Sequence, residues 1–305
     1  MSNNINLLEL VSACIDLAEQ SGDIIRDVFK SGSLGVQMKA EDDPMTKADL
    51  LSQQHIIGGL NNVFKDLIIV GEESCEIPPS TTIPNIHKLD TQKDNLPQQF
   101  QSLDPKDLII FIDPLDATRE FTLGRVHCVM TLIGISFKGK PIAGVIYQPF
   151  VDKEGHESTR EESDKWTGRT VWAIVGMPVE SVQDKRAPED KDKVIIVTTA
   201  SHYTQKIEES IKKINPDKVI KTGGAGYKTL MVIENRADVY VFPSVGSKLW
   251  DICAPHAILL AVGGTLTDPF GKDILYSTDP SLIENKNGIV ITTGNHKKYI
   301  DLLNK

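Results

Sequence analysis

Hydrophobic positions near the start of the chain repeat with the spacing of an α-helix. Between residues 7 and 29, apolar side chains recur every three or four positions, and Ser31-Gly32 follows. This pattern predicts one long helix with a buried face, because residues three and four apart share one side of a helix and glycine often follows a helix end. A second helix is predicted over about residues 47–64, and a short apolar strand over residues 67–70.

The middle of the chain shows strand-like apolar runs between polar segments. Strands are predicted over residues 108–112, 129–137, 141–147 and 170–175, with Gly139-Lys140 as the hairpin turn between the second and third. Residues 77–107 are rich in proline and polar residues. That composition predicts a long surface segment, mobile or loosely packed, with at most a short helix.

Strands and helices alternate in the second half. The predicted strands cover residues 194–198, 237–242 and 289–293, and the predicted helices cover residues 204–214, 227–234 and 252–262. Alternation around a β-rich centre is typical of a layered α/β or α+β architecture. No internal repeat interrupts this order.

Composition and charge narrow the possible functions. The chain has 305 residues, of which 40% are hydrophobic and 25% charged, as expected for one large domain or two tightly joined ones. The net charge of −9 argues against binding a nucleic-acid polymer, because an acidic field repels polyanions. An acidic protein can still bind a phosphate where metal ions invert the local charge.

The cysteines and the N-terminus indicate where the protein works. The four cysteines are widely spaced and form no CxxC pair, which argues against a zinc site and favours buried free thiols in a reducing compartment. The first residues lack the basic start of a signal peptide, and no apolar run approaches the ~20 residues of a membrane span. We therefore expect a cytoplasmic protein without a membrane partner.

Acidic residues follow the predicted strands at the points where those strands end. Glu72 and Glu73 come after residues 67–70, and Asp113 and Asp116 come directly after residues 108–112. Functional groups often lie where a rigid strand gives way to a loop. Two carboxylates this close repel unless cations lie between them, and hard oxygen ligands favour Mg²⁺. Taken alone, Asp113 and Asp116 are equally well explained as a capped turn, and Glu72 and Glu73 are better explained as solvated loop acids.

Two further aspartates stand at predicted helix starts. Asp49 opens the second helix, and Asp251 precedes an apolar helix with Pro255 in its first turn. An aspartate at either place is also explained by capping or by the helix dipole alone. The backbone N–H groups of Ala117 and Thr118, beside the acidic pair, could form a phosphate cradle at a helix start.

Four motifs together resemble a known family. They are residues 43–49, Gly71-Glu72-Glu73-Ser74, residues 113–118 and residues 250–255. Their order is similar to that of the lithium-sensitive, magnesium-dependent phosphatases, which include inositol monophosphatase, inositol polyphosphate 1-phosphatase, fructose-1,6-bisphosphatase and the 3′(2′),5′-bisphosphate nucleotidases. The resemblance implies a layered α-β-α-β-α sandwich of the inositol monophosphatase type. It also implies an N-terminal half, residues 1–150, with most metal ligands, and a C-terminal half, residues 151–305, with the substrate-binding segments.

The resemblance assigns roles to individual residues. It implies two or three Mg²⁺ ions, with ligands from Glu72, Asp113, the carbonyl of Leu115, Asp116 and Asp251. It implies that Asp49 and Thr118 orient and deprotonate the attacking water. Two ions about 3.5–4 Å apart suit a phosphoryl transfer in which water attacks in line.

Finer features resemble the nucleotidase branch. Residues 197–202 and 223–228 are similar to its nucleotide-binding segments. The implied substrate-binding groups are Ser201, His202, Gly224 and Lys228, with Ala117, Thr118 and Asp251 at the phosphate. The partner is then a small phosphate ester, and the expected reaction removes the 3′-phosphate of adenosine 3′,5′-bisphosphate to give AMP.

Alternatives to this reaction stay open. An inositol polyphosphate 1-phosphatase, or an enzyme with both activities, has the same metal motifs. A non-catalytic scaffold of the same fold is a third reading, although the complete set of acids argues against it. The sequence leaves the oligomeric state open.

One residue departs from the family pattern. The family usually has glycine where this chain has Ala117. Alanine can still donate its N–H if its φ is negative, whereas a positive φ at this position would require the loop to shift.

Overall fold

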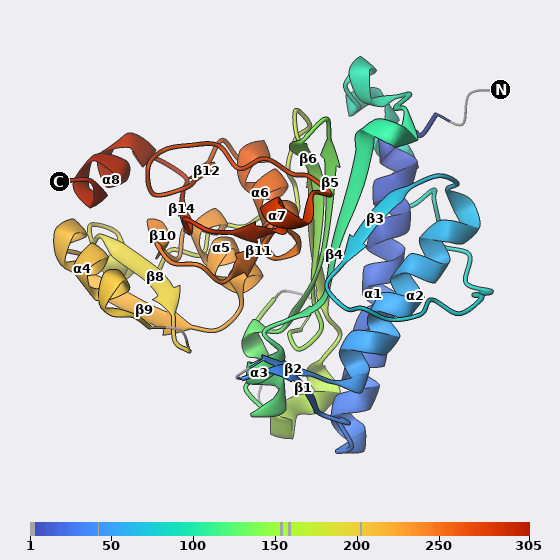
Figure 1. Cartoon of the computed structure of the whole chain (residues 1–305), viewed down its shortest axis with the longest axis horizontal. Coiled ribbons are helices and arrows are strands. Elements are labelled where there is room, and N and C mark those ends of the chain that lie inside the picture. Colours follow the sequence, from blue (N-terminus) through green and yellow to red (C-terminus); the bar gives the residue numbers. More distant parts are fainter. Residues whose placement is uncertain (1–3, 42, 153–154, 158–159, 202) are drawn as a thin grey trace.

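The computed structural model describes residues 4–41, 43–152, 155–157, 160–201 and 203–305. Helices and sheets lie in alternating layers, with two helical pairs outside and one between the sheets (Figure 1). The predicted α-β-α-β-α sandwich is confirmed. In the described residues no helix is long and apolar enough to cross a membrane.

The first sheet has the strand order β3-β4-β5-β6-β7. β3 pairs with β4 in parallel, and the other neighbours are antiparallel. The strands are β3 (Ile68–Gly71), β4 (Leu108–Asp116), β5 (Met130–Phe137), β6 (Lys140–Gln148) and β7 (Arg169–Ile174). β7 completes this sheet although it follows residue 150 in the sequence. A division of the chain into halves at that residue stays a prediction.

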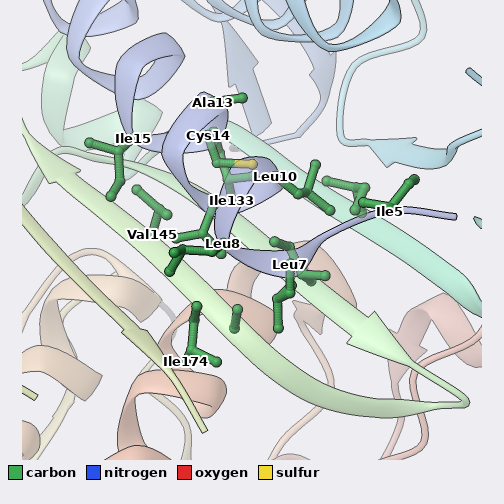
Figure 2. Close-up of a cluster of buried hydrophobic side chains, with 14 of the residues drawn as sticks. Ile5, Leu7, Leu8, Leu10, Ala13, Cys14, Ile15, Ile133, Val145 and Ile174 are labelled. Carbon is green, nitrogen blue, oxygen red and sulfur yellow. The ribbon is translucent and has the colours of Figure 1, made fainter. Parts of the chain in front are cut away.

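Helices α1 (Leu7–Ser31) and α2 (Lys47–Val63) cover one face of the first sheet. Gly32 ends α1 with a φ of 68°, as the sequence predicts, and the side chain of Asn6 caps its start. Figure 2 shows Leu8 and Ile15 of α1 against Val145 of β6, within the largest apolar core on this side.

The second sheet has the strand order β12-β14-β10-β8-β9. Helices α5 (Ala225–Ile233) and α6 (Leu249–Ala261) fill the space between the sheets, and α4 (Gln205–Ile214) and α8 (His296–Leu303) lie outside (Figure 1). The strands are β8 (Ile195–Thr199), β9 (Lys218–Thr222), β10 (Val239–Phe242), β12 (Thr265–Thr267) and β14 (Ile289–Thr292). Smaller elements are the pairs β1 (Gln37–Ala40) with β2 (Asp43–Met45) and β11 (Ser247–Lys248) with β13 (Glu284–Asn285), and the short helices α3 (Thr118–Thr122) and α7 (Pro280–Ile283).

The segment 77–107 is more firmly packed than its composition predicts. Leu89, Leu96, Phe100 and Leu103 are buried in the core beside α1, whereas Ile83 is 78% exposed. Leu103 also pairs with Ile5 through two backbone hydrogen bonds of 2.8 Å. The prediction of loose packing is therefore wrong, because a few spaced apolar residues are enough to anchor a polar segment. Short 3₁₀ turns, Asp90–Asn95, Gln98–Phe100 and Pro105–Asp107, are its regular structure.

The hairpin between β5 and β6 turns one residue earlier than predicted. Phe137 pairs with Lys140, so the two turn residues are Lys138 and Gly139, with φ of 51° and 77°. A two-residue turn of this kind needs positive φ at both positions, and glycine supplies one of them without strain.

Candidate active site

A cavity of about 200 Å³ opens where the ends of β3 and β4 face the starts of α5 and α6. Most of the residues singled out in the sequence line it together. They are Glu72, Asp113, Leu115, Asp116, Ala117, Thr118, Ser201, Gly224, Lys228 and Asp251. Asp49 lies buried behind this lining, and His202 lies outside the described residues.

Asp49 and Thr118 form a hydrogen-bonded pair. The Thr118 hydroxyl lies 2.9 Å from Asp49 Oδ1 and 2.9 Å from the carbonyl oxygen of Leu115, so its single proton serves one of them at a time. Burial raises the pKa of Asp49 to about 6, against hydrogen bonds that lower it. A buried carboxyl of this kind is suited to accepting a proton near neutral pH.

Thr46 holds the Asp49 carboxylate in place. Its backbone N–H and its hydroxyl donate to Asp49 Oδ2 at 2.8 and 2.6 Å, and its hydroxyl accepts from the Ala48 N–H. This is a capping box that starts α2. The sequence analysis did not single out Thr46, although the Thr-x-x-Asp spacing before a helix could have indicated it.

The carboxylates around the cavity repel one another. Burial and the nearby Glu72, Asp116 and Asp251 raise the pKa of Asp113 well above its usual range. Burial also raises the pKa of Asp116, although the nearby charge of Lys228 acts to lower it. Burial raises the pKa of Asp251 as well, and the charge of Glu72 raises it further. A cluster whose members resist ionising together is one that cations would stabilise.

Backbone N–H groups hold each of these carboxylates in position. Asp113 Oδ1 accepts from Leu115 at 3.0 Å, and Asp251 Oδ2 accepts from Lys248 at 2.7 Å. Asp251 is therefore the third residue of α6 rather than its N-cap. The helix begins earlier than predicted because a carboxylate can cap from inside the first turn.

The start of α5 approaches Asp116 closely. The Gly226 N–H donates to Asp116 Oδ2 at 2.7 Å, and the Ala225 N–H to Oδ1 at 3.1 Å. Gly224 has a φ of 71°, and a Cβ there would lie 2.8 Å from the carbonyl of Cys128. The glycine-rich run therefore permits both a positive φ and close packing against the acidic loop.

Lys39, which the sequence analysis did not single out, reaches the acidic cluster from β1. Its Nζ lies 2.8 Å from both Glu72 Oε1 and Glu73 Oε1. Burial lowers the pKa of Lys39, but these two carboxylates outweigh burial and the net pKa is raised. The Glu73 backbone N–H donates a hydrogen bond to the side-chain oxygen of Gln53 at 2.9 Å, which fixes the same loop. No sequence signal linked Lys39 to the cluster, because the contact depends on the β1–β2 hairpin.

Ala117 adopts the left-handed conformation, with a φ of 73° and a ψ of 40°. The phosphate cradle was expected to survive unchanged only if the φ of Ala117 were negative. This φ is positive, so that condition is not met. An L-residue in this region costs roughly 1–2 kcal/mol, and a glycine avoids that cost. The strain lies in the loop that joins Asp116 to α3.

We expect Ala117→Gly to raise the free energy of unfolding by about 0.5–1 kcal/mol, since relief of strain exceeds the added entropy of the unfolded chain. Urea denaturation measures the change. The matched control is Gly124→Ala, at a φ of 75° with open space around it, which should lose about 1 kcal/mol. A loss of stability in Ala117→Gly would contradict this reading of the loop.

The residues present fit divalent magnesium. The carboxylates at the cavity offer hard oxygen ligands, and burial first, then neighbouring carboxylates, raise the pKa of Asp113 and of Asp251. Within the described ranges, no three Asp, Glu, His or Cys side chains already converge as a metal site. Lys39 Nζ holds one of the nearby carboxylates, that of Glu72, at 2.8 Å.

The fold and the acidic cavity together define a phosphate monoester hydrolase. The sequence model of the inositol monophosphatase family matches residues 6–305, so the chain belongs to that family. Members of this family are generally magnesium-dependent phosphatases. The resemblance inferred from the four motifs is confirmed.

Individual relatives agree with this placement. The chain is 68% identical to "3'(2'),5'-bisphosphate nucleotidase 1" of Dictyostelium discoideum, over 99% of this chain and 98% of the relative. It is 38% identical to the protein of the same name in Homo sapiens, over 98% and 95%. Among solved structures, the suhB protein of Bartonella henselae aligns with a TM-score of 0.68 at 18% identity, over 97% of this chain and 98% of that one, and so supports the fold.

Proposed function

We propose that the chain removes the 3′-phosphate of adenosine 3′,5′-bisphosphate to give AMP and phosphate. The observation that carries this proposal is the Thr118 hydroxyl, which lies within 2.9 Å of Asp49 Oδ1 at the edge of an acidic cavity. The names of the relatives, which match along the whole chain, support the choice of a nucleoside bisphosphate.

The metal ligands are part of this proposal. Glu72, Asp113, Asp116, Asp251 and the Leu115 carbonyl would hold two or three Mg²⁺ ions. Bound Mg²⁺ neutralises the charge of the phosphate and lowers the pKa of water. The side chains must ionise to bind it, so binding releases protons from carboxyls whose pKa is raised.

The chain's own groups then perform the transfer. Thr118, which donates to Asp49, accepts a hydrogen bond from a water in the cavity and aligns it with the phosphorus. As the water oxygen bonds to phosphorus, its proton passes by way of Thr118 to Asp49. The bond from phosphorus to the ribose 3′ oxygen breaks, and that oxygen takes a proton from solvent. The backbone N–H groups of Ala117 and Thr118, at the start of α3, would donate to the phosphate oxygens.

Lys228 supports a choice of bisphosphate over monophosphate. Its side chain lines the cavity, lies nearly buried, and donates to the Gly224 carbonyl at 2.5 Å. Burial lowers its pKa, while Asp116 and Asp251 oppose that change. A buried ammonium with a neutral partner is suited to a second phosphate.

We expect wild type to hydrolyse adenosine 3′,5′-bisphosphate with a higher kcat/KM than inositol monophosphate. Lys228→Ala should lower the first value about 10- to 100-fold and the second much less, because only the bisphosphate gains a charge-assisted contact. Lys212→Ala, an exposed lysine on α4, is the control. Equal losses of kcat/KM on both substrates would show that Lys228 neutralises the charge of the nearby carboxylates and does not bind the second phosphate. A wild type that prefers the inositol ester would overturn the nucleotidase proposal.

Lithium is expected to inhibit the reaction at sub-millimolar to millimolar concentration. Li⁺ has nearly the radius of Mg²⁺ but half its charge, so it can occupy an oxygen site without supporting turnover. Phosphate release in lithium chloride, against potassium chloride at the same ionic strength, measures the effect. Equal rates in the two salts would contradict it.

We also propose that the enzyme works in the cytoplasm. The four cysteines are free, and Cys14, Cys128 and Cys253 are buried. Free thiols of this kind are typical of a reducing compartment.

A further inference from the structure

A second cavity, of about 650 Å³, continues from the first. Glu72, Ser201 and Asp251 line both cavities, so one bound ligand can extend from the first cavity into the second. The character of the lining changes along this path. Asp113, Asp116 and Lys228 line only the first cavity, whereas Tyr203, Val245 and Trp250 line only the second.

Tyr203 stands out in this lining because a cation covers part of its ring. Lys221 Nζ lies 3.6 Å from the centre of the Tyr203 ring. Lys221 is placed there by β9, where it pairs with Thr198 of β8. Tyr203 lines the second cavity, whereas Lys221 is absent from the described lining of both cavities. The residue as a whole is 36% exposed despite this contact.

We propose that Tyr203 is the platform on which the base of the nucleotide stacks. This inference rests on the proposed function, because it concerns the part of the substrate that does not react. Ser201 lies two residues before Tyr203 and borders both cavities, so a sugar at Ser201 separates a phosphate among the carboxylates from a base at Tyr203.

The chemistry of the pair suits a nucleobase. Every base has a flat π-face, and stacking on an aromatic side chain depends little on which base is present. The ammonium of Lys221 holds the ring from one side, which reduces the freedom lost when a base binds. Thr204 and Ser244, on the rim of the same cavity, offer hydroxyl groups at the edge of the base.

Two substrates that differ only in the base test this assignment. One is adenosine 3′,5′-bisphosphate, and the other is its abasic analogue, 1-deoxyribose 3,5-bisphosphate. Wild type should show a kcat/KM about 5- to 100-fold higher for the substrate with the base, the range expected for one stacked base. Tyr203→Ala should remove most of this preference through KM and leave the abasic substrate unchanged.

Two variants separate stacking from other effects. Tyr203→Phe keeps the ring and should keep the preference within about twofold, because the hydroxyl is not needed for stacking. Lys221→Met should retain more of the preference than Tyr203→Ala does. Calorimetric binding of AMP, against ribose 5-phosphate, compares ligands with and without the base in the absence of turnover.

The outcomes distinguish the two proposals. If wild type hydrolyses both substrates equally well, the stacking role of Tyr203 is wrong and the nucleotidase proposal stands. If Tyr203→Ala keeps the full preference for the base, another group binds the base. If wild type hydrolyses neither substrate, the proposed function fails, and the stacking role fails with it.

Discussion

Asp116→Asn should lower phosphate release at least about 10³-fold, because an amide oxygen is a neutral and weak ligand for Mg²⁺ and several kcal/mol of charge stabilisation are lost. The shape of the site should survive. An asparagine can still accept the hydrogen bond from the Gly226 N–H through its single side-chain oxygen, and it loses the longer one from the Ala225 N–H. Phosphate release measured over a range of Mg²⁺ concentrations tests this expectation, and near-normal rates at modest Mg²⁺ would show that the ligand assignment is wrong.

The same variant should be more stable than wild type when a chelator removes divalent ions. Burial raises the pKa of Asp116, so the folded state holds its proton more tightly than the unfolded state does. Stability from such a group is present below the unfolded pKa and is lost as pH rises through the folded pKa. Asparagine does not titrate, so its advantage should grow with pH above about 4. Calorimetry should also show that Mg²⁺ stabilises wild type much more than the variant.

Asp49→Asn and Thr118→Ala should each lower kcat about 10²- to 10⁴-fold with little change in KM, since both residues act on water and not on the bound substrate. The pKa of Asp49, about 6, sets the direction of the pH dependence. The ionised form accepts the proton, so wild-type kcat should rise with pH through about 6. The residual activity of Asp49→Asn should lack that rise.

The double variant tests whether the two residues work as one unit. If they do, the kcat of the double variant should be close to that of the less active single variant, because losses of kcat within one catalytic unit are not additive. Thr122→Ala is the matched control, since that hydroxyl is in α3 but bonds to the Arg119 carbonyl. An effect confined to KM would move Asp49 and Thr118 into the substrate-binding group.

The elements that sequence alone predicted well are those with a strong local pattern. The helical period of α1 is visible in the sequence because a whole face of this helix is buried in the core. The apolar run of β4 is visible because nearly the whole strand is buried. β9 and α8 were missed for the opposite reason. β9 is mostly exposed, and the apolar residues of α8 are too few to show a clear period.

The site was predictable where residues adjacent in sequence act together. Within residues 113–118, a stiff turn joins β4 to α3, so the relative positions of these side chains follow from the local sequence. Lys39, Thr46 and Tyr203 were not predicted to belong to the site. The Lys39 contact with Glu72 and the Lys221 contact with Tyr203 arise from strand pairing, and the printed order of residues does not show such partners.

The cavity lies at the boundary between layers, with Asp113 at the end of a strand of one sheet and Asp251 at the start of a helix between the sheets. An ion shared by these two carboxylates would tie together segments separated by more than a hundred positions in the sequence. Its binding energy would then be lost whenever either segment opened. Cooperativity of unfolding would therefore depend on cation concentration, and local opening at the mouth of the cavity would become as rare as opening of the core.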